Sequence, residues 1–324
     1  MESLETSEPE KLNPFNNLFL ARGFYTGRND WWIYILGIFL AIIGYVVAQI
    51  IIIVPLMGVA TNHGLSLSEI TKNPNILFNP EAMGMNRSVM LALLMLMFVF
   101  CLLGLFVAIR FIHRKTISSV ISGFEKIRWS RYFFSFTVWS LLLIILTVIS
   151  YYSAPEELEI RFQLKPFLIL LLVACIFIPI QTATEEILFR GYLMQGLGIG
   201  SKNGLMPLIT TSVLFGLMHG ANPETEAFGF ATMMPYYMSF GLFLGLITLL
   251  DEGLELAMGI HCANNLISSL LVTSKNSVLQ TDAVFYQKTE DPGGEIYAWL
   301  VMAAICFGIL YVKYRWKNWN VIIK

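Results

Sequence analysis

The chain has 324 residues, of which 56% are hydrophobic and only 13% are charged, and its net charge is −1. Soluble domains devote about a quarter of their residues to Asp, Glu, Lys and Arg, so much of this surface does not face water. The mean hydropathy of +0.67 agrees. The near-zero net charge excludes a general affinity for nucleic acid. The 4 cysteines form no CxxC pair, which favours buried thiols over disulfides or a metal cluster.

Apolar blocks of about 20 residues, the length that a membrane-spanning helix needs, recur along the chain. They begin near Trp31, Ser88, Tyr132, Lys165, Leu205, Ala231, Gly253 and Ile296. The first block is too long for the apolar region of a signal peptide, so we expect it to remain as a span. The fifth, Leu205 to Gly220, is the shortest. The sequence predicts an all-α polytopic membrane protein with a bundle of about eight transmembrane helices.

Lys and Arg are unevenly distributed between the connecting segments. They concentrate between the second and third blocks, from Arg110 to Arg131, and after the last block, from Lys313 to Lys324. Cytoplasmic loops carry an excess of Lys and Arg, so both segments are predicted to face the cytoplasm. Both termini then lie on that side, which requires an even number of spans. We expect an integral protein of the bacterial plasma membrane.

The fourth block carries charged side chains where a span should have none. It reads Thr184-Glu185-Glu186-Ile-Leu-Phe-Arg190, and a charge near the bilayer centre costs at least ~2.5 kcal/mol. Glu186 and Arg190 are spaced i, i+4 with the acid first, the favourable order for an ion pair. Glu185 points about 100° away from Glu186 on the helix. We expect Glu185 to lack a partner on its own helix and to be free for acid–base chemistry.

Two more blocks carry a histidine each. Phe215-x-x-x-His219 lies in the fifth block and His261-x-x-x-Asn265 in the seventh. In each motif the first and last residues share a helix face. Helix rise places Glu185 ~16 Å, His219 ~22 Å and His261 ~12 Å from the cytoplasmic ends of their helices. The three groups should therefore converge near the midplane or in the cytoplasmic half of the membrane.

Together these motifs resemble those of the CAAX prenyl endopeptidase and bacteriocin-processing (CPBP) family of type II CAAX proteases. The resemblance covers about Leu164 to Val272. It implies an intramembrane endopeptidase in which Glu185 and His219 activate the attacking water. It also implies that His261 and Asn265 stabilise the oxyanion, while Glu186, Arg190 and Phe215 support the site. Asn264 is a second candidate for the oxyanion role, but the i, i+4 spacing favours Asn265.

The chemistry leaves a choice of cofactor and of function class. Glu185, His219 and His261 would also suit zinc as ligands, although the HExxH spacing is absent. A metal-free mechanism is preferred. The substrate is expected to be a lipidated or hydrophobic protein or peptide at the bilayer. One alternative is a non-catalytic membrane scaffold or bacteriocin-immunity protein that binds a peptide or partner. A proton-coupled transporter is the third hypothesis, and no inverted repeat supports it.

The chain is expected to divide into four regions. Residues 1–30 form a cytoplasmic tail, for which an interfacial position or a flexible one is expected. Residues 31–160 hold the N-terminal helices and loops, including an irregular outer segment from Thr61 to Arg87 that caps the bundle. Residues 161–275 form the catalytic core, where Asp251, Glu252 and Glu255 are expected to cap a helix N-terminus. Residues 276–324 contain the last outer loop, the final helix and a basic tail.

Overall fold

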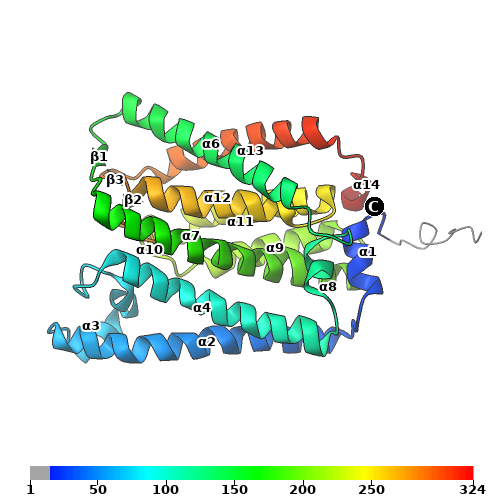
Figure 1. Cartoon of the computed structure of the whole chain (residues 1–324), viewed down its shortest axis with the longest axis horizontal. Coiled ribbons are helices and arrows are strands. Elements are labelled where there is room, and N and C mark those ends of the chain that lie inside the picture. The colour runs from blue at the N-terminus through cyan, green and yellow to red at the C-terminus, as the bar shows by residue number, and fades with distance from the viewer. Residues whose placement is uncertain (1–14, 324) are drawn as a thin grey trace, which may run out of the picture.

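The computed structural model describes residues 15–323 as a bundle of long helices that run side by side (Figure 1). The bundle helices are α2 (Trp31–Asn62), α4 (Arg87–Val107), α6 (Trp129–Ser153), α7 (Leu164–Glu186), α9 (Leu205–Met218), α11 (Phe230–Asp251), α12 (Glu255–Leu271) and α13 (Pro292–Tyr314). Each begins within a few residues of a predicted apolar block. The all-α polytopic membrane architecture expected from the sequence is thereby confirmed.

The bundle helices differ in whether they can cross a bilayer alone. In the described residues, 6 helices are long and apolar enough to do so. The exceptions are α9, with 14 residues, and α12, with 17. At 1.5 Å per residue, α9 reaches only about 21 Å, less than the ~30 Å hydrocarbon core. It therefore ends at membrane depth, and both exceptions carry a histidine motif.

The fourth span is the longest, because three segments follow one another without a break from Leu164 to Ser201. After α7 the backbone adopts a π-helix, η4 (Ile187–Leu193), and then continues as α8 (Met194–Ser201). π-helical turns are rare and are frequently found at functional sites. Here the π-helix starts immediately after Glu186 and contains Arg190. α7 runs on through Pro179 without a break.

Short elements close the end of the bundle away from α1. The strands β1 (Leu158–Ile160), β2 (Val272–Ser274) and β3 (Phe285–Gln287) form a sheet in the order β1-β3-β2. β1 pairs with β3 antiparallel and β2 pairs with it in parallel. The expected cap between α2 and α4 contains α3 (Leu67–Lys72) and the 3₁₀ turn η2 (Pro74–Phe78). Ile70, Leu77 and Met83 bury their side chains there in an apolar cluster with α2 and α4.

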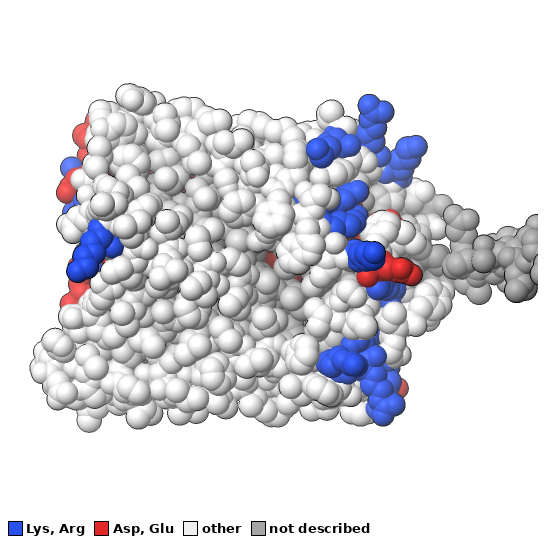
Figure 2. All heavy atoms as spheres, in the orientation of Figure 1, with Lys and Arg blue, Asp and Glu red and all other residues white. Residues whose placement is uncertain are grey.

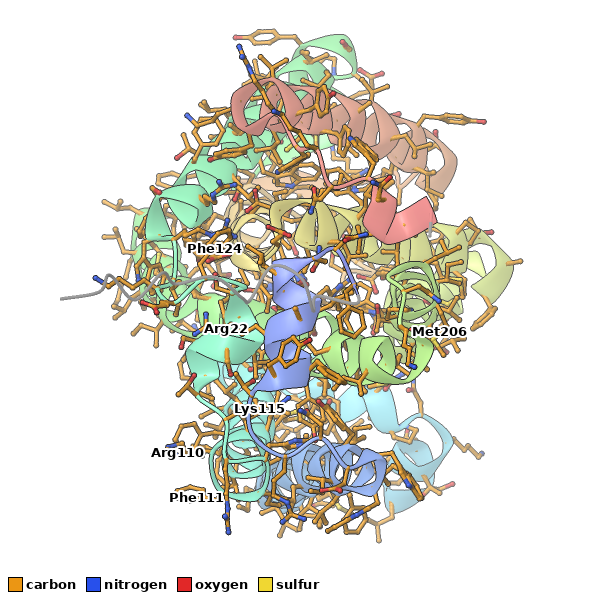
Figure 3. The ribbon with its side chains drawn as sticks, turned by 90° about the vertical axis from the view of Figure 1, so that its right-hand side faces the viewer. Arg22, Arg110, Phe111, Lys115, Phe124 and Met206 are labelled. Atoms are coloured by element: carbon orange, nitrogen blue, oxygen red, sulfur yellow. The ribbon has the colours of Figure 1, made fainter. Side chains whose placement is uncertain are left out.

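The opposite end is covered by α1 (Leu18–Tyr25), which carries Arg22 and lies across the helix ends near Lys115 (Figure 3). Phe19 and Leu20 are fully or almost fully buried. The Asn17 side chain caps α1 and donates to the carbonyl of Leu249 at 2.8 Å. This part of the predicted tail is therefore packed into the protein, because its apolar face is buried against the bundle. Residues 1–14 of the tail lie outside the described residues.

The same end carries most of the visible Lys and Arg side chains, whereas few appear at the other end (Figure 2). The remaining short helices are η3 (Ala108–Ile112), α5 (Ile117–Ile121), α10 (Pro223–Phe228) and α14 (Asn320–Ile323). The concentration of Lys and Arg at the end covered by α1 is the distribution that the loop sequences predicted.

The acidic residues around the start of α12 do not cap this helix with side-chain hydrogen bonds, because its N-cap residue is Leu254. Arg128 forms ion pairs with Asp251 at 2.9 Å and with Glu255 at 2.6 Å. Arg131 also pairs with Asp251, and the Trp316 indole donates to the same carboxylate at 2.9 Å. These five residues, which we call the end cluster, connect three segments that are distant in sequence. The capping prediction was wrong, because Asp251 and Glu252 end α11 and only Glu255 lies in the first turn of α12.

Candidate active site

Glu186 is the most enclosed carboxylate of the candidate site. Its side chain is 0% exposed, and Oε1 accepts a hydrogen bond from Arg190 Nη1 at 2.8 Å. The predicted i, i+4 ion pair is confirmed. The Arg190 guanidinium also donates to the Gly241 carbonyl at 3.2 Å and lies 4.2 Å from the Phe215 ring centre. A buried charge is costly unless it is paired, so this arrangement fixes both side chains.

His261 joins the two glutamates of α7. Its Nδ1 lies 2.7 Å from Glu186 Oε1. A carboxylate accepts, so Nδ1 carries the hydrogen. On the other side of the ring, Nε2 lies 3.5 Å from Glu185 Oε2 and 3.4 Å from Asn265 Nδ2. The expected pairing of His261 with Asn265 is thus present. The contact between His261 and Glu186 was not expected, because it depends on how α12 and α7 are rotated about their axes.

One oxygen of the Glu185 carboxylate accepts a hydrogen bond, and the other does not. Gln181, one turn earlier on α7, donates from Nε2 to Glu185 Oε1 at 2.7 Å. The expectation that Glu185 lacks a partner on its own helix was therefore wrong, because a neutral amide fills that position. Glu185 Oε2 is buried and makes no hydrogen bond within the described residues. The side chain as a whole keeps 13% of its surface exposed, whereas Glu186 keeps none.

His219 lies at the end of α9, where the helix stops inside the bundle. Its Nδ1 makes a 2.8 Å hydrogen bond with the Phe215 carbonyl, which accepts, so the hydrogen is on Nδ1 and Nε2 has a lone pair. The ring stacks on Tyr237 at 4.3 Å between centres. In the described chain no hydrogen bond links His219 to Glu185. Phe215 connects the two histidines, since its ring centre lies 4.7 Å from His219 and 5.9 Å from His261.

Three amide side chains and an indole extend the site, and of these the sequence pointed only to Asn265, with Asn264 as an alternative. Asn265 donates to Gln181 at 3.0 Å, and Asn264 donates to Asn265 at 3.1 Å. Trp139 on α6 donates to Asn264 at 3.1 Å. The i, i+4 spacing of Gln181 and Glu185 could have identified Gln181 from the sequence. Trp139 had no such signal, because it lies on a helix without any motif.

The geometry bears on the zinc alternative. Both histidines are held through Nδ1, by a carboxylate in one case and a carbonyl in the other. This is how metal-binding histidines are commonly oriented, so the donor chemistry of the two Nε2 atoms and Glu185 suits zinc. Zinc also needs its ligands close together. In residues 15–323 no group of three His, Cys, Asp or Glu side chains converges closely enough to hold a metal ion.

The family model described as type II CAAX prenyl endopeptidase Rce1-like matches residues 164–267, the segment that holds every predicted site residue. The uncharacterized protein YyaK of Bacillus subtilis (strain 168) is 33% identical over 255 residues, which are 78% of this chain and 81% of that protein. No solved structure matches. The chain therefore belongs to the type II CAAX prenyl endopeptidase Rce1-like family, and membership of this family implies CAAX-type intramembrane protease activity.

Proposed function

We propose that the protein is an intramembrane endopeptidase that hydrolyses a peptide bond of a lipidated or hydrophobic protein or peptide. The observation that carries the proposal is the contrast between adjacent carboxylates. Glu186 is fully buried and bound by Arg190 and His261. Glu185 forms no ion pair with an arginine among the described residues, keeps 13% of its side chain exposed, and places Oε2, which makes no hydrogen bond, 3.5 Å from His261 Nε2. A carboxylate in such a position is suited to take a proton from a water molecule.

The proposed reaction uses the free atoms of the site. Glu185 Oε2 takes a proton from a water that His219 Nε2 helps to orient, and the hydroxide attacks the carbonyl carbon of the scissile bond. The Asn265 amide stabilises the oxyanion together with His261, whose Nε2 can donate when the ring carries a proton on both nitrogens. Glu185 then passes the proton to the amide nitrogen as the C–N bond breaks. The products are a carboxylic acid and an amine, and Glu185 returns to its starting form.

The short helix α9 supports access of water to this site. Its last turn brings His219 to membrane depth, where irregular backbone is tolerated only if it is buried in protein or lines a water-filled space. His219 itself is only half-buried. We propose that the basic end and both termini face the cytoplasm of a bacterium, and that substrate reaches the site from that side.

The decisive variant is Glu185→Gln, which keeps the side-chain volume but removes the base. We expect cleavage to fall by about 10³-fold or more. A proteomic comparison of membranes that contain the wild-type protein and the variant should show accumulated precursors, which would identify the substrate. Glu226→Gln changes an exposed carboxylate on α10 and is the matched control. A correctly folded Glu185→Gln protein that cleaves at the wild-type rate would overturn the proposal and favour a non-catalytic scaffold or immunity protein.

Metal dependence can be tested on the purified protein. We prefer a metal-free mechanism and expect cleavage to persist within about twofold after dialysis against a strong chelator. If zinc were required, removal would abolish activity, because a bound metal contributes several kcal/mol to the stabilisation of transition-state charge. Loss of cleavage that added zinc restores, but magnesium does not, would replace the proposed mechanism with a zinc mechanism through Glu185, His219 and His261.

A further inference from the structure

A continuous line of hydrogen bonds crosses three helices and ends on the proposed base. It starts at the Trp139 indole on α6, passes through Asn264 and Asn265 on α12 and through Gln181 on α7, and reaches Glu185 Oε1. The donor–acceptor distances are 3.1, 3.1, 3.0 and 2.7 Å in that order. Each amide accepts with its oxygen and donates with its nitrogen. We call Trp139, Asn264, Asn265 and Gln181 the amide chain.

The two ends of the amide chain determine its direction. An indole N–H can only donate, and an ionised carboxylate can only accept. A reversed amide at Asn264 would set its NH₂ against the Trp139 N–H. A reversed amide at Gln181 would set its oxygen against the Glu185 carboxylate. Only one orientation of all three amides satisfies every contact, and in a low-dielectric interior such networks are strengthened by their neighbours.

This orientation affects the two groups that the proposed function needs. Because the Gln181 amide occupies Glu185 Oε1, the free oxygen is Oε2, the one that faces His261 Nε2. Because Asn265 gives one amide hydrogen to Gln181 Oε1, its second hydrogen lies on the side of His261 Nε2, 3.4 Å away, where the proposed oxyanion would form. The amide chain thus sets both the position of the base and the direction of an oxyanion donor.

We propose that Gln181 is a positioning residue for catalysis, oriented from a distance by Asn264 and Trp139. The inference rests on the proposed function of Glu185 and Asn265. It goes beyond that function, since it assigns a role to side chains outside the three motifs. Preorganisation of this kind is effective because a misplacement of about 1 Å can cost about 10²-fold in rate.

The kinetic test replaces single members of the amide chain in the full-length protein. The probe is a quenched fluorescent peptide with a farnesylated cysteine followed by aliphatic residues, assayed in proteoliposomes. We expect Gln181→Met to lower kcat about 30-fold with KM within about twofold, Asn264→Leu about 10-fold, and Trp139→Phe about 3-fold. Gln195→Met is the matched control, because Gln195 is also a buried amide with two hydrogen bonds, but these go to Phe19 and Ser119 at the other end of the bundle.

A purely structural role would give a different pattern. Gln181→Met and Gln195→Met would then both reduce thermal stability and leave kcat of the folded enzyme unchanged, and that result would overturn the inference. If Gln181→Met keeps the wild-type kcat while Glu185→Gln is inactive, only the inference fails. If Glu185→Gln is itself active, the proposed function fails first, so the two failures can be told apart.

A second measurement requires no substrate. Nuclear magnetic resonance of side-chain amides in lipid nanodiscs reports the hydrogen bonds of Gln181, Asn264 and Asn265 directly. We expect Trp139→Phe, which removes only the first donor, to shift the signals of all three amides in sequence, and the Gln195 signals to stay unchanged. Gln181 signals that do not respond to Trp139→Phe would show that the line of contacts does not act as a unit, and would contradict the proposal.

Discussion

The protein contains two buried clusters of acidic and basic side chains, and they differ in which of their carboxylates are paired with an arginine. In the end cluster, both oxygens of Asp251 lie within ion-pair distance of an arginine, and Trp316 donates to one of them as well. In the candidate site, Glu185 and Glu186 each have one oxygen without a hydrogen bond among the described residues, but only Glu186 is paired with an arginine. The same residue types therefore stabilise contacts between loops in one place and remain available for chemistry in the other.

The comparison also shows why burial alone does not identify a site. Asp251 and Glu186 side chains are both fully buried, while Glu185 is 13% exposed. A buried carboxylate with all of its charge compensated gains nothing from a substrate, because new contacts would have to replace existing ones. Glu185 forms no ion pair with an arginine among the described residues and is partly accessible, so it can bind a water molecule without losing an ion pair.

The largest effect on the comparison should come from Arg190→Met, which removes the cation that pairs with Glu186. Loss of one partner of a buried ion pair costs about 3–5 kcal/mol, because the other charge remains buried. We expect that loss in unfolding by sodium dodecyl sulfate, together with loss of cleavage as His261 loses its fixed partner. Arg190→Lys keeps the positive charge, and its stability and cleavage rate should lie between those of the wild type and of Arg190→Met. An Arg190→Met protein as stable as the wild type would contradict the structural role of the pair.

A smaller effect is expected from Arg128→Met in the end cluster. Arg128 is 17% exposed, so solvent offsets part of the loss, and we expect a decrease of about 2 kcal/mol in the free energy of unfolding. The rate of cleavage per folded molecule should stay within about twofold, because the end cluster shares no hydrogen bond with the site among the described residues. A tenfold fall in that rate at unchanged stability would show that the two clusters are coupled.

The smallest effect concerns His113, which lies beyond α4 at the basic end. Its Nδ1 donates to the Arg28 carbonyl at 2.7 Å, and its Nε2 accepts from the Tyr192 hydroxyl at 2.7 Å. Burial lowers the pKa of His113 to about 4. The unfolded imidazole takes up its proton near pH 6.5, so this contribution to stability is present above pH 6.5 and is lost as the pH falls toward 4.

Thermal unfolding between pH 7.5 and pH 5 checks this sign. The wild-type midpoint should fall more steeply on acidification than that of His113→Gln, whose amide can make both hydrogen bonds without titrating. Parallel curves for the two proteins would mean that His113 does not sense pH in this range. Cleavage at the site should follow stability only, because His113 is at the α1 end of the bundle.

The sequence alone determined the approximate starts of the bundle helices, since hydropathy reports directly whether a helix can be surrounded by lipid. It also determined the pairs within one helix, Glu186 with Arg190 and His261 with Asn265, because i, i+4 spacing fixes their neighbourhood whatever the rest of the fold does. The tertiary structure decided which helix faces meet. Contacts between His261 and Glu186, or between Trp139 and Asn264, depend on the rotation and depth of separate helices, which local periodicity does not specify. For the same reason only the assembled bundle showed that α1 is buried and that Glu185 is open on a single oxygen.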